Sequence, residues 1–101
     1  MRDTIATAIA WYRAEDWATL KARAVDAGKM HATHAEWLAG AINAERDVRK
    51  QGVKTMRITL DLDALTLWCS IRGRVNDGAA RSEYAAELAD KRLDAASRRG
   101  R

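Results

Sequence analysis

Proline and phenylalanine are absent from this 101-residue chain, and cysteine occurs once, as Cys69. An alanine-rich chain without proline favours helix, and a single cysteine excludes a disulfide within the chain. A free thiol fits a reducing compartment, so we expect a cytoplasmic protein. No apolar run approaches the roughly 20 residues that cross a bilayer, and the first residues do not resemble a signal peptide. We therefore expect no membrane partner.

Bulky apolar residues are scarce, which limits the core that one copy can form. At 101 residues the chain is one domain, near the lower size limit for a self-sufficient core. Much of the buried area must come from four tryptophans, which are Trp11, Trp17, Trp37 and Trp68. Such a chain gains stability when a dimer buries more apolar surface.

The excess positive charge is concentrated at the C-terminus. The chain carries 18 lysines and arginines against 14 aspartates and glutamates, for a net charge of +4. Three of the arginines are Arg98, Arg99 and Arg101, so the rest of the chain is close to neutral. We expect a single domain over residues 1–97 and a basic tail over residues 98–101.

One segment has the pattern of a β-strand, over about residues 55–62. Its apolar side chains are Met56, Ile58, Leu60 and Leu62, and its polar ones are Arg57, Thr59 and Asp61. This period of two predicts a half-buried strand. The main-chain groups of a strand need partners, and the sequence offers no second strand. We therefore expect a homodimer joined through residues 56–62.

The remainder reads as helix, so we predict a mainly α fold with four to five helices and a single strand. In the N-terminal part, residues 1–52, Asp3 caps a first helix whose apolar stripe loses phase near Glu15. That stripe comprises Ile5, Ala8, Ile9 and Tyr12. Either two helices meet near Glu15 or one helix shifts its face. Thr33 and Glu36 match a capping box, which predicts a helix over residues 34–51 ending at Gly52.

The C-terminal part, residues 53–97, reads as strand, helix and helix. Asp63 is the expected cap of a short helix over residues 64–72, which Gly73 stops. We expect this helix to be largely buried because apolar residues cover most of its circumference, namely Leu65, Leu67, Trp68 and Ile71. A turn at Asn76 and Asp77 then precedes a last helix over residues 78–97.

This order over residues 54–93 resembles the ribbon-helix-helix DNA-binding proteins. The resemblance implies that two strands pair antiparallel across a dimer and lie in the major groove. It implies that Thr55, Arg57 and Thr59 read base edges. Arg81 and Ser82, near the start of the second helix, then match the place where main-chain amides hold a phosphate.

Three short segments are also similar to small bacterial proteins that have no known activity. These segments are Glu36-Trp37-Leu38, Leu67-Trp68-Cys69 and Asp77-Gly78-Ala79-Ala80-Arg81. The similarity implies a stand-alone bacterial domain and no particular chemistry.

The residues that most often carry chemistry do not form a catalytic or metal-binding pattern. His31 and His34 have a spacing that metal sites use, but Cys69 and scattered carboxylates do not complete a ligand set. Cys69 lies in an apolar helix, which favours a buried side chain over a nucleophile. Asp61 and Asp63 have no histidine beside them for acid–base work. We predict no catalytic residue, no metal, no cofactor and no enzyme activity.

Two functions are consistent with this reading. The first is a dimeric protein that binds double-stranded DNA, such as a small transcriptional regulator or an antitoxin-like module. The second is a protein-interaction module or inhibitor of bacterial or mobile-element origin, with no nucleic-acid role. The near-neutral body, Asp61 on the outward face of the strand and the tryptophan content favour the second. Trp11, which lies off the predicted stripe, is the tryptophan expected to contact a partner.

Overall fold

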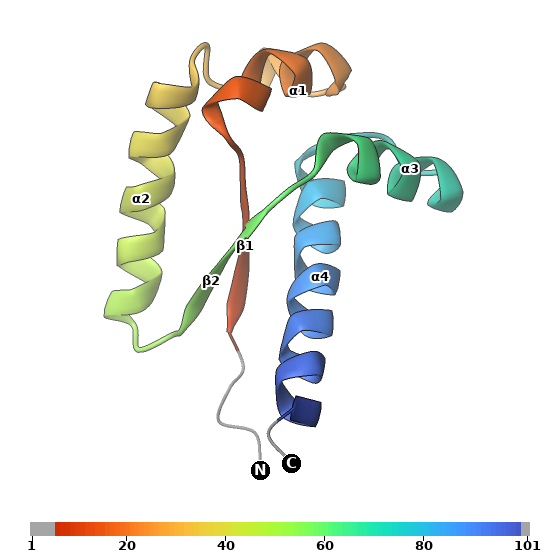
Figure 1. Ribbon diagram of the computed structural model, residues 1–101. Coiled ribbons are helices and arrows are strands. Elements are labelled where there is room, and N and C mark those ends of the chain that lie inside the picture. Colours follow the sequence, from red (N-terminus) through yellow and green to blue (C-terminus); the bar gives the residue numbers. More distant parts are fainter. Residues whose placement is uncertain (1–5, 100–101) are drawn as a thin grey trace.

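The computed structural model describes residues 6–99, with side chains described for residues 6–95. Two short strands lie at the centre of the molecule, with long helices on either side (Figure 1). In chain order the elements are β1 (Thr7–Trp11), the 3-10 turn η1 (Ala14–Asp16), α1 (Trp17–Arg23), the 3-10 turn η2 (Ala27–Lys29), α2 (His34–Lys50), β2 (Thr55–Thr59), α3 (Leu62–Arg72) and α4 (Gly78–Arg99). The fold is mainly helical, as predicted.

The expectation of a single strand is wrong, because β2 has a partner within the same chain. β1 and β2 pair in parallel, from Thr7 opposite Thr55 to Trp11 opposite Thr59. Residues 7–11 had been assigned to a first helix, since alanine favours helix and the apolar spacing fits its period. Pairing with β2 overrides that local preference, because it gives both strands main-chain hydrogen bonds and buries one face of each. The predicted cap, Asp3, lies outside the described residues.

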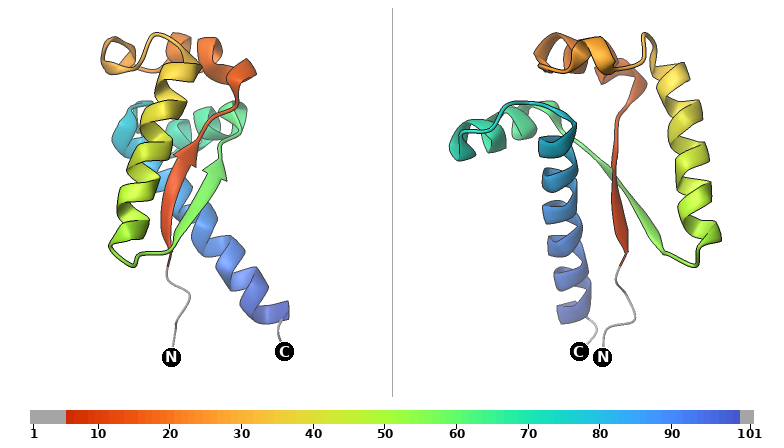
Figure 2. Two further views of the ribbon diagram at one scale, coloured as in Figure 1. Left: turned by 90° about the vertical axis from the view of Figure 1, so that its left-hand side faces the viewer. Right: turned by 180° about the vertical axis from the view of Figure 1, so that it is seen from behind.

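Helices cover both faces of this two-stranded sheet. Figure 2 shows α2 and α4 on opposite sides of the strands. α4 packs against both strands, and the side chains that β2 turns toward it include Ile58, which is fully buried. Ala8 and Ala10 of β1 pack on the same cluster, and their small size lets the helix lie close to the sheet. The other face of β2, which carries Arg57, is turned toward α2.

A single apolar cluster joins both predicted parts of the chain. Its largest fully buried side chains are Leu20, Ile58, Leu60 and Leu65. An aromatic group borders it, made of Trp11, Tyr12, Trp17, His34 and Trp37 with ring centroids 5.0–5.9 Å apart. Trp68 packs separately against Tyr84, at 5.4 Å. Trp17 and Trp68 are buried in the cluster and Trp37 packs against it, so these three tryptophans contribute to the core as predicted.

Several helix ends follow the local signals in the sequence. The capping box of Thr33 and Glu36 is complete, because each side chain accepts a hydrogen bond from the main-chain N–H of the other residue. Gly52 and Gly73 have φ angles of 81° and 63°, the left-handed conformation expected after a helix. Asp77 caps α4 by accepting a hydrogen bond from Ala80 N at 2.9 Å.

α3 begins earlier than predicted, and its cap is Asp61. The Asp61 carboxylate accepts a hydrogen bond from Ala64 N at 2.9 Å, and the strand ends at Thr59. Asp63 instead forms an ion pair with Arg23 at 3.0 Å. The preference for Asp63 was therefore wrong, since two aspartates in the same turn offered a cap and only the backbone path decides between them.

α3 is also less buried than predicted. Leu67 and Ile71 are 61% and 71% exposed, whereas Leu65, Trp68 and Cys69 are buried. One side of α3 packs against the rest of the protein and the opposite side is exposed to solvent, although both sides carry apolar residues. The amount of apolar surface in a helix therefore did not predict how many sides it buries.

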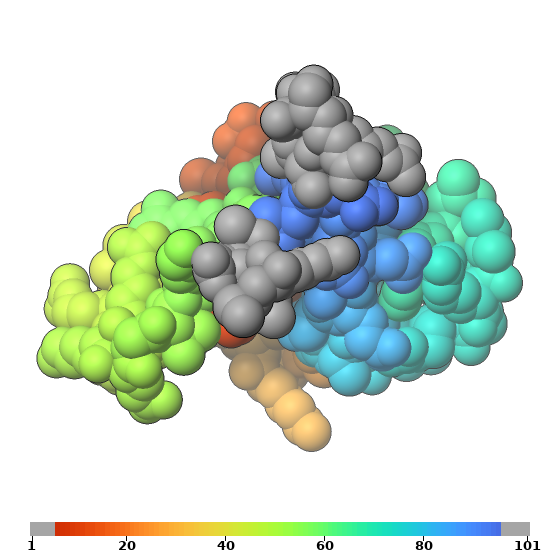
Figure 3. Space-filling view, turned by 90° about the horizontal axis from the view of Figure 1, so that it is seen from below, coloured from red at the N-terminus to blue at the C-terminus, as the bar shows by residue number. Residues whose placement is uncertain are grey.

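The described chain starts and finishes at the same end of the molecule (Figure 1). α4 continues to Arg99, two residues past its predicted end, so the first two residues of the predicted tail belong to the helix. Figure 3 views this end, where the last turns of α2 and the lower part of α4 both face the reader. None of the described helices is long and apolar enough to cross a membrane.

Candidate functional site: a cationic pocket between α2 and β2

The site is built around an ion pair between the central strand and the helix that covers it. Arg57 of β2 donates two hydrogen bonds to Glu45 of α2, from Nε at 2.8 Å and from Nη2 at 2.7 Å. The Glu45 side chain is 4% exposed and the Arg57 side chain is 46% exposed. A carboxylate this enclosed needs such a partner, and the two-point geometry fixes the guanidinium plane.

Arg49 strengthens the same carboxylate from the next turn of α2. Its Nη2 lies 3.7 Å from Glu45 Oε2, and its Nε donates to Thr55 Oγ1 at 2.8 Å. The hydrogen bonds from Arg57 lower the pKa of Glu45 below its ordinary value, so the carboxylate stays charged at neutral pH. The Arg57 guanidinium also lies 4.0 Å from the centre of the Trp11 ring, a cation–π contact.

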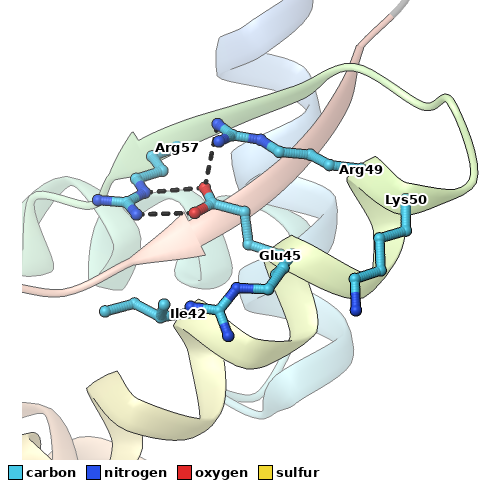
Figure 4. A pocket seen from close by; sticks show the side chains of 6 residues that line it. Ile42, Glu45, Arg49, Lys50 and Arg57 are labelled. Atoms are coloured by element: carbon cyan, nitrogen blue, oxygen red, sulfur yellow. Dashed lines mark hydrogen bonds and ion pairs between the residues drawn. The ribbon is translucent and has the colours of Figure 1, made fainter.

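Around this pair lies an open pocket of about 470 Å³. Six residues line it, which are Ile42, Glu45, Arg46, Arg49, Lys50 and Arg57 (Figure 4). Four of these side chains are cations and one is a carboxylate that is already hydrogen-bonded. We call this site the cationic pocket. Its charged side chains suit an anion.

The structure places the three predicted strand residues on the side of the sheet that faces α2. Arg57 and Thr59 are exposed and Thr55 is half-buried. Two of the three are tied to α2, because Arg57 bonds Glu45 and Thr55 accepts from Arg49. The face predicted to read DNA therefore borders the cationic pocket and shares Arg57 with it.

Arg81 and Ser82 lie elsewhere, on α4 across the sheet from α2. Arg81 is 5% exposed, and its guanidinium donates to Tyr12, Asp26 and Asn76. Ser82 is exposed. The structure therefore does not bring these two residues together with Arg57, and it gives Arg81 an internal role.

Two of the first amides of α4, where the resemblance implies a phosphate, already have acceptors. Gly78 N donates to Asp26 Oδ2 at 3.0 Å, and Ala80 N donates to Asp77 at 2.9 Å. Arg81 bonds the same Asp26 carboxylate and lowers its pKa below the ordinary value. Asp26 therefore occupies the position at this helix end that an anion would take.

The other candidate residues have structural surroundings. A ring nitrogen of His34 lies 2.7 Å from Tyr12 O, and burial raises the pKa of the Cys69 thiol. Trp11 is half-buried, with its ring edge-on to Trp37 at a centroid distance of 5.1 Å. Across the residues that the structure describes, no group of three His, Cys, Asp or Glu side chains could hold a metal ion.

Sequence reasoning missed four charged residues of the site, which are Glu45, Arg46, Arg49 and Lys50. Cations in the last turns of a helix are ordinary complements to its dipole, so by themselves they do not indicate a site. A signal was present, since residues 45–57 hold five lysines and arginines against two carboxylates. The sequence alone does not show that these residues share a site, because only the return of the chain after Gly52 brings β2 back against α2.

Comparison of this chain with protein-family models, with curated proteins and with solved structures finds no match.

Proposed function

We propose that this protein binds DNA as a homodimer, holding phosphates with the cationic pocket and presenting Thr55, Arg57 and Thr59 beside it. The observation that carries the proposal is the convergence of four cations from α2 and β2 on one open pocket. Phosphate contacts by lysine and arginine supply most of the affinity of a protein for DNA. Side chains next to such contacts can then meet base edges.

The charge around the pocket favours a polyanionic partner. Only Glu45 opposes the four cations that line it, and Arg57 occupies both oxygens of that carboxylate. Arginine suits phosphate because its planar group donates two hydrogen bonds at once. The fold thus adds Arg57 of β2 to three cations that the last turns of α2 already carry.

The edge of β2 supports a dimer. Thr7 N donates to Lys54 O and Leu60 N donates to Trp11 O, so in a parallel ladder the even-numbered residues of β2 face β1. The main-chain groups of Thr55, Arg57 and Thr59 therefore point to the outer edge. An antiparallel pair of β2 strands centred on Arg57 would give all of these groups partners.

DNA binding is tested by fluorescence anisotropy with short labelled duplexes over a range of salt concentrations. We expect Lys50→Ala to weaken binding and to reduce the slope of log affinity against log salt by about 1. Lys29→Ala is the matched control, since Lys29 is also an exposed lysine and lies in η2, near the other end of α2. Absence of binding at low salt, or equal effects of the two substitutions, refutes the proposal.

The dimer is tested by light scattering. Thr59→Pro removes an N–H that points to the outer edge and leaves the β1–β2 ladder intact, so we expect it to yield a monomer. Thr59→Ala keeps that N–H and should remain dimeric. A monomeric wild-type protein would contradict the assembly without bearing on phosphate contacts.

A protein-interaction module is the second candidate, and one observation favours it. Leu67 and Ile71 lie one turn apart on the open side of α3 and are 61% and 71% exposed. Large apolar side chains exposed together often mark a protein interface. This function requires a protein partner that binds the wild-type protein with fixed stoichiometry and does not bind the Leu67→Asp variant. It also requires that the wild-type protein alone does not bind DNA duplexes.

A further inference from the structure

We infer that the cationic pocket prefers a phosphate group that ends a chain, such as a terminal phosphate of a nucleic-acid strand or inorganic pyrophosphate, over an internal phosphodiester. For the nucleic-acid source the inference rests on the proposed function and specifies it. For pyrophosphate it stands on the pocket alone.

The cationic pocket carries positive charge that its own carboxylate does not compensate. Four cations face one carboxylate, so the lining carries three more positive charges than negative ones. An internal phosphodiester brings one negative charge, whereas a phosphate monoester carries about 1.5 to 2 at neutral pH. A terminal phosphate therefore neutralises more of the positive charge of the pocket than an internal phosphodiester does.

The pocket also retains hydrogen-bond donors that no described residue uses fully. Lys50 makes no hydrogen bond or ion pair with any described residue, and Arg46 has only a 3.5 Å contact with Asn43 Oδ1. Arg57 uses Nε and Nη2 on Glu45, which leaves its Nη1 open. These donors come from α2 and from β2, on different sides of the pocket (Figure 4). A phosphate monoester offers three terminal oxygens to such donors, and a diester offers two.

Glu45 explains how the cations stay close together without a ligand. Its enclosed carboxylate bonds Arg57 and lies 3.7 Å from Arg49, so it holds two guanidinium groups that would otherwise repel each other. Glu45 is thus a positioning residue, and it orients donors before the anion arrives.

The helix dipole acts against this inference and is too small to reverse it. The pocket lies at the C-terminal end of α2, which bears about half a negative charge. That partial charge accounts for cations in the last turn of α2, but it does not account for Arg57, which comes from β2. The pocket remains positive by more than two charges after the dipole is included.

The test uses the full-length protein and two oligonucleotides of one sequence, one with a 5′-phosphate and one with a 5′-hydroxyl. By calorimetry we expect the phosphorylated strand to bind about tenfold more tightly, as expected for one added charge-assisted contact. Pyrophosphate should compete with it. Lys50→Ala and Arg46→Ala should abolish the preference, Glu45→Gln should reduce it, and Lys29→Ala should preserve it.

The outcomes separate the two proposals. Equal affinity of the wild-type protein for both strands overturns the terminal-phosphate preference, while salt-dependent duplex binding would still support the proposed function. Binding of pyrophosphate that Lys50→Ala abolishes, with no binding of either strand, supports the pocket and refutes the DNA-binding role. No binding of pyrophosphate or of either strand refutes both.

Discussion

Replacing Arg81 by alanine should destabilise the protein strongly, because this arginine joins three separate segments from the interior. Its guanidinium donates to both oxygens of Asp26 at 3.1 and 2.9 Å, to Asn76 at 2.9 Å and to Tyr12 Oη at 3.1 Å. The Arg81 side chain is 6% exposed and that of Asp26 is 22% exposed. The alanine variant loses these bonds and leaves Asp26 without its counter-ion.

The magnitude follows from this burial. Removing one partner of a buried ion pair costs about 3–5 kcal/mol, and a partly exposed Asp26 regains some hydration, so we expect about 3 kcal/mol. For a domain of this size each kcal/mol lowers the melting temperature by about 4–8 °C, which gives a decrease of about 12–24 °C. Native domains have about 5–15 kcal/mol of stability, so the variant should still fold in the cold.

The assay is thermal unfolding followed by circular dichroism at neutral pH. Arg13→Ala is the control, because Arg13 also pairs with an aspartate, Asp16, but its side chain is 58% exposed. An exposed pair contributes less than about 1 kcal/mol, so the control should change the melting temperature little. If Arg81→Ala melts within about 4 °C of the wild-type protein, the internal role assigned to Arg81 is refuted.

Two further predictions concern the backbone and the carboxylates. Gly73→Ala should lower the free energy of unfolding by about 1–2 kcal/mol, because Gly73 has a φ of 63°, which is unfavourable for alanine. No atom lies near enough for the new methyl group to clash, so backbone strain is the whole effect. An unchanged midpoint of chemical denaturation would contradict a left-handed residue there. Asp26 and Glu45 have pKa values lowered from ordinary values of 3.8 and 4.5. The stability that these carboxylates contribute is therefore complete above the ordinary values and is lost as the pH falls through their folded-state pKa values. In Asp26→Asn the free energy of unfolding, measured from neutral to acidic pH, should fall less steeply than in the wild-type protein.

The sequence by itself determined the features that depend on one or two turns of chain. Thr33 and Glu36 mark the start of α2 because the capping box closes within four residues. Gly73 marks the end of α3 because only glycine adopts that backbone conformation without strain. The apolar alternation after Thr55 likewise located β2, since its period lies within the strand itself.

Only the tertiary structure decided which segments meet. The strand character of residues 7–11 depends on β2, which lies 48 residues further along the chain in the register Thr7 to Thr55. The same holds for the contacts of Arg57 with Glu45 and of Arg81 with Asp26, which are 12 and 55 residues apart. Helix caps and strand periodicity are local energies that a short window contains, whereas strand pairing and charge partners depend on how the whole chain packs.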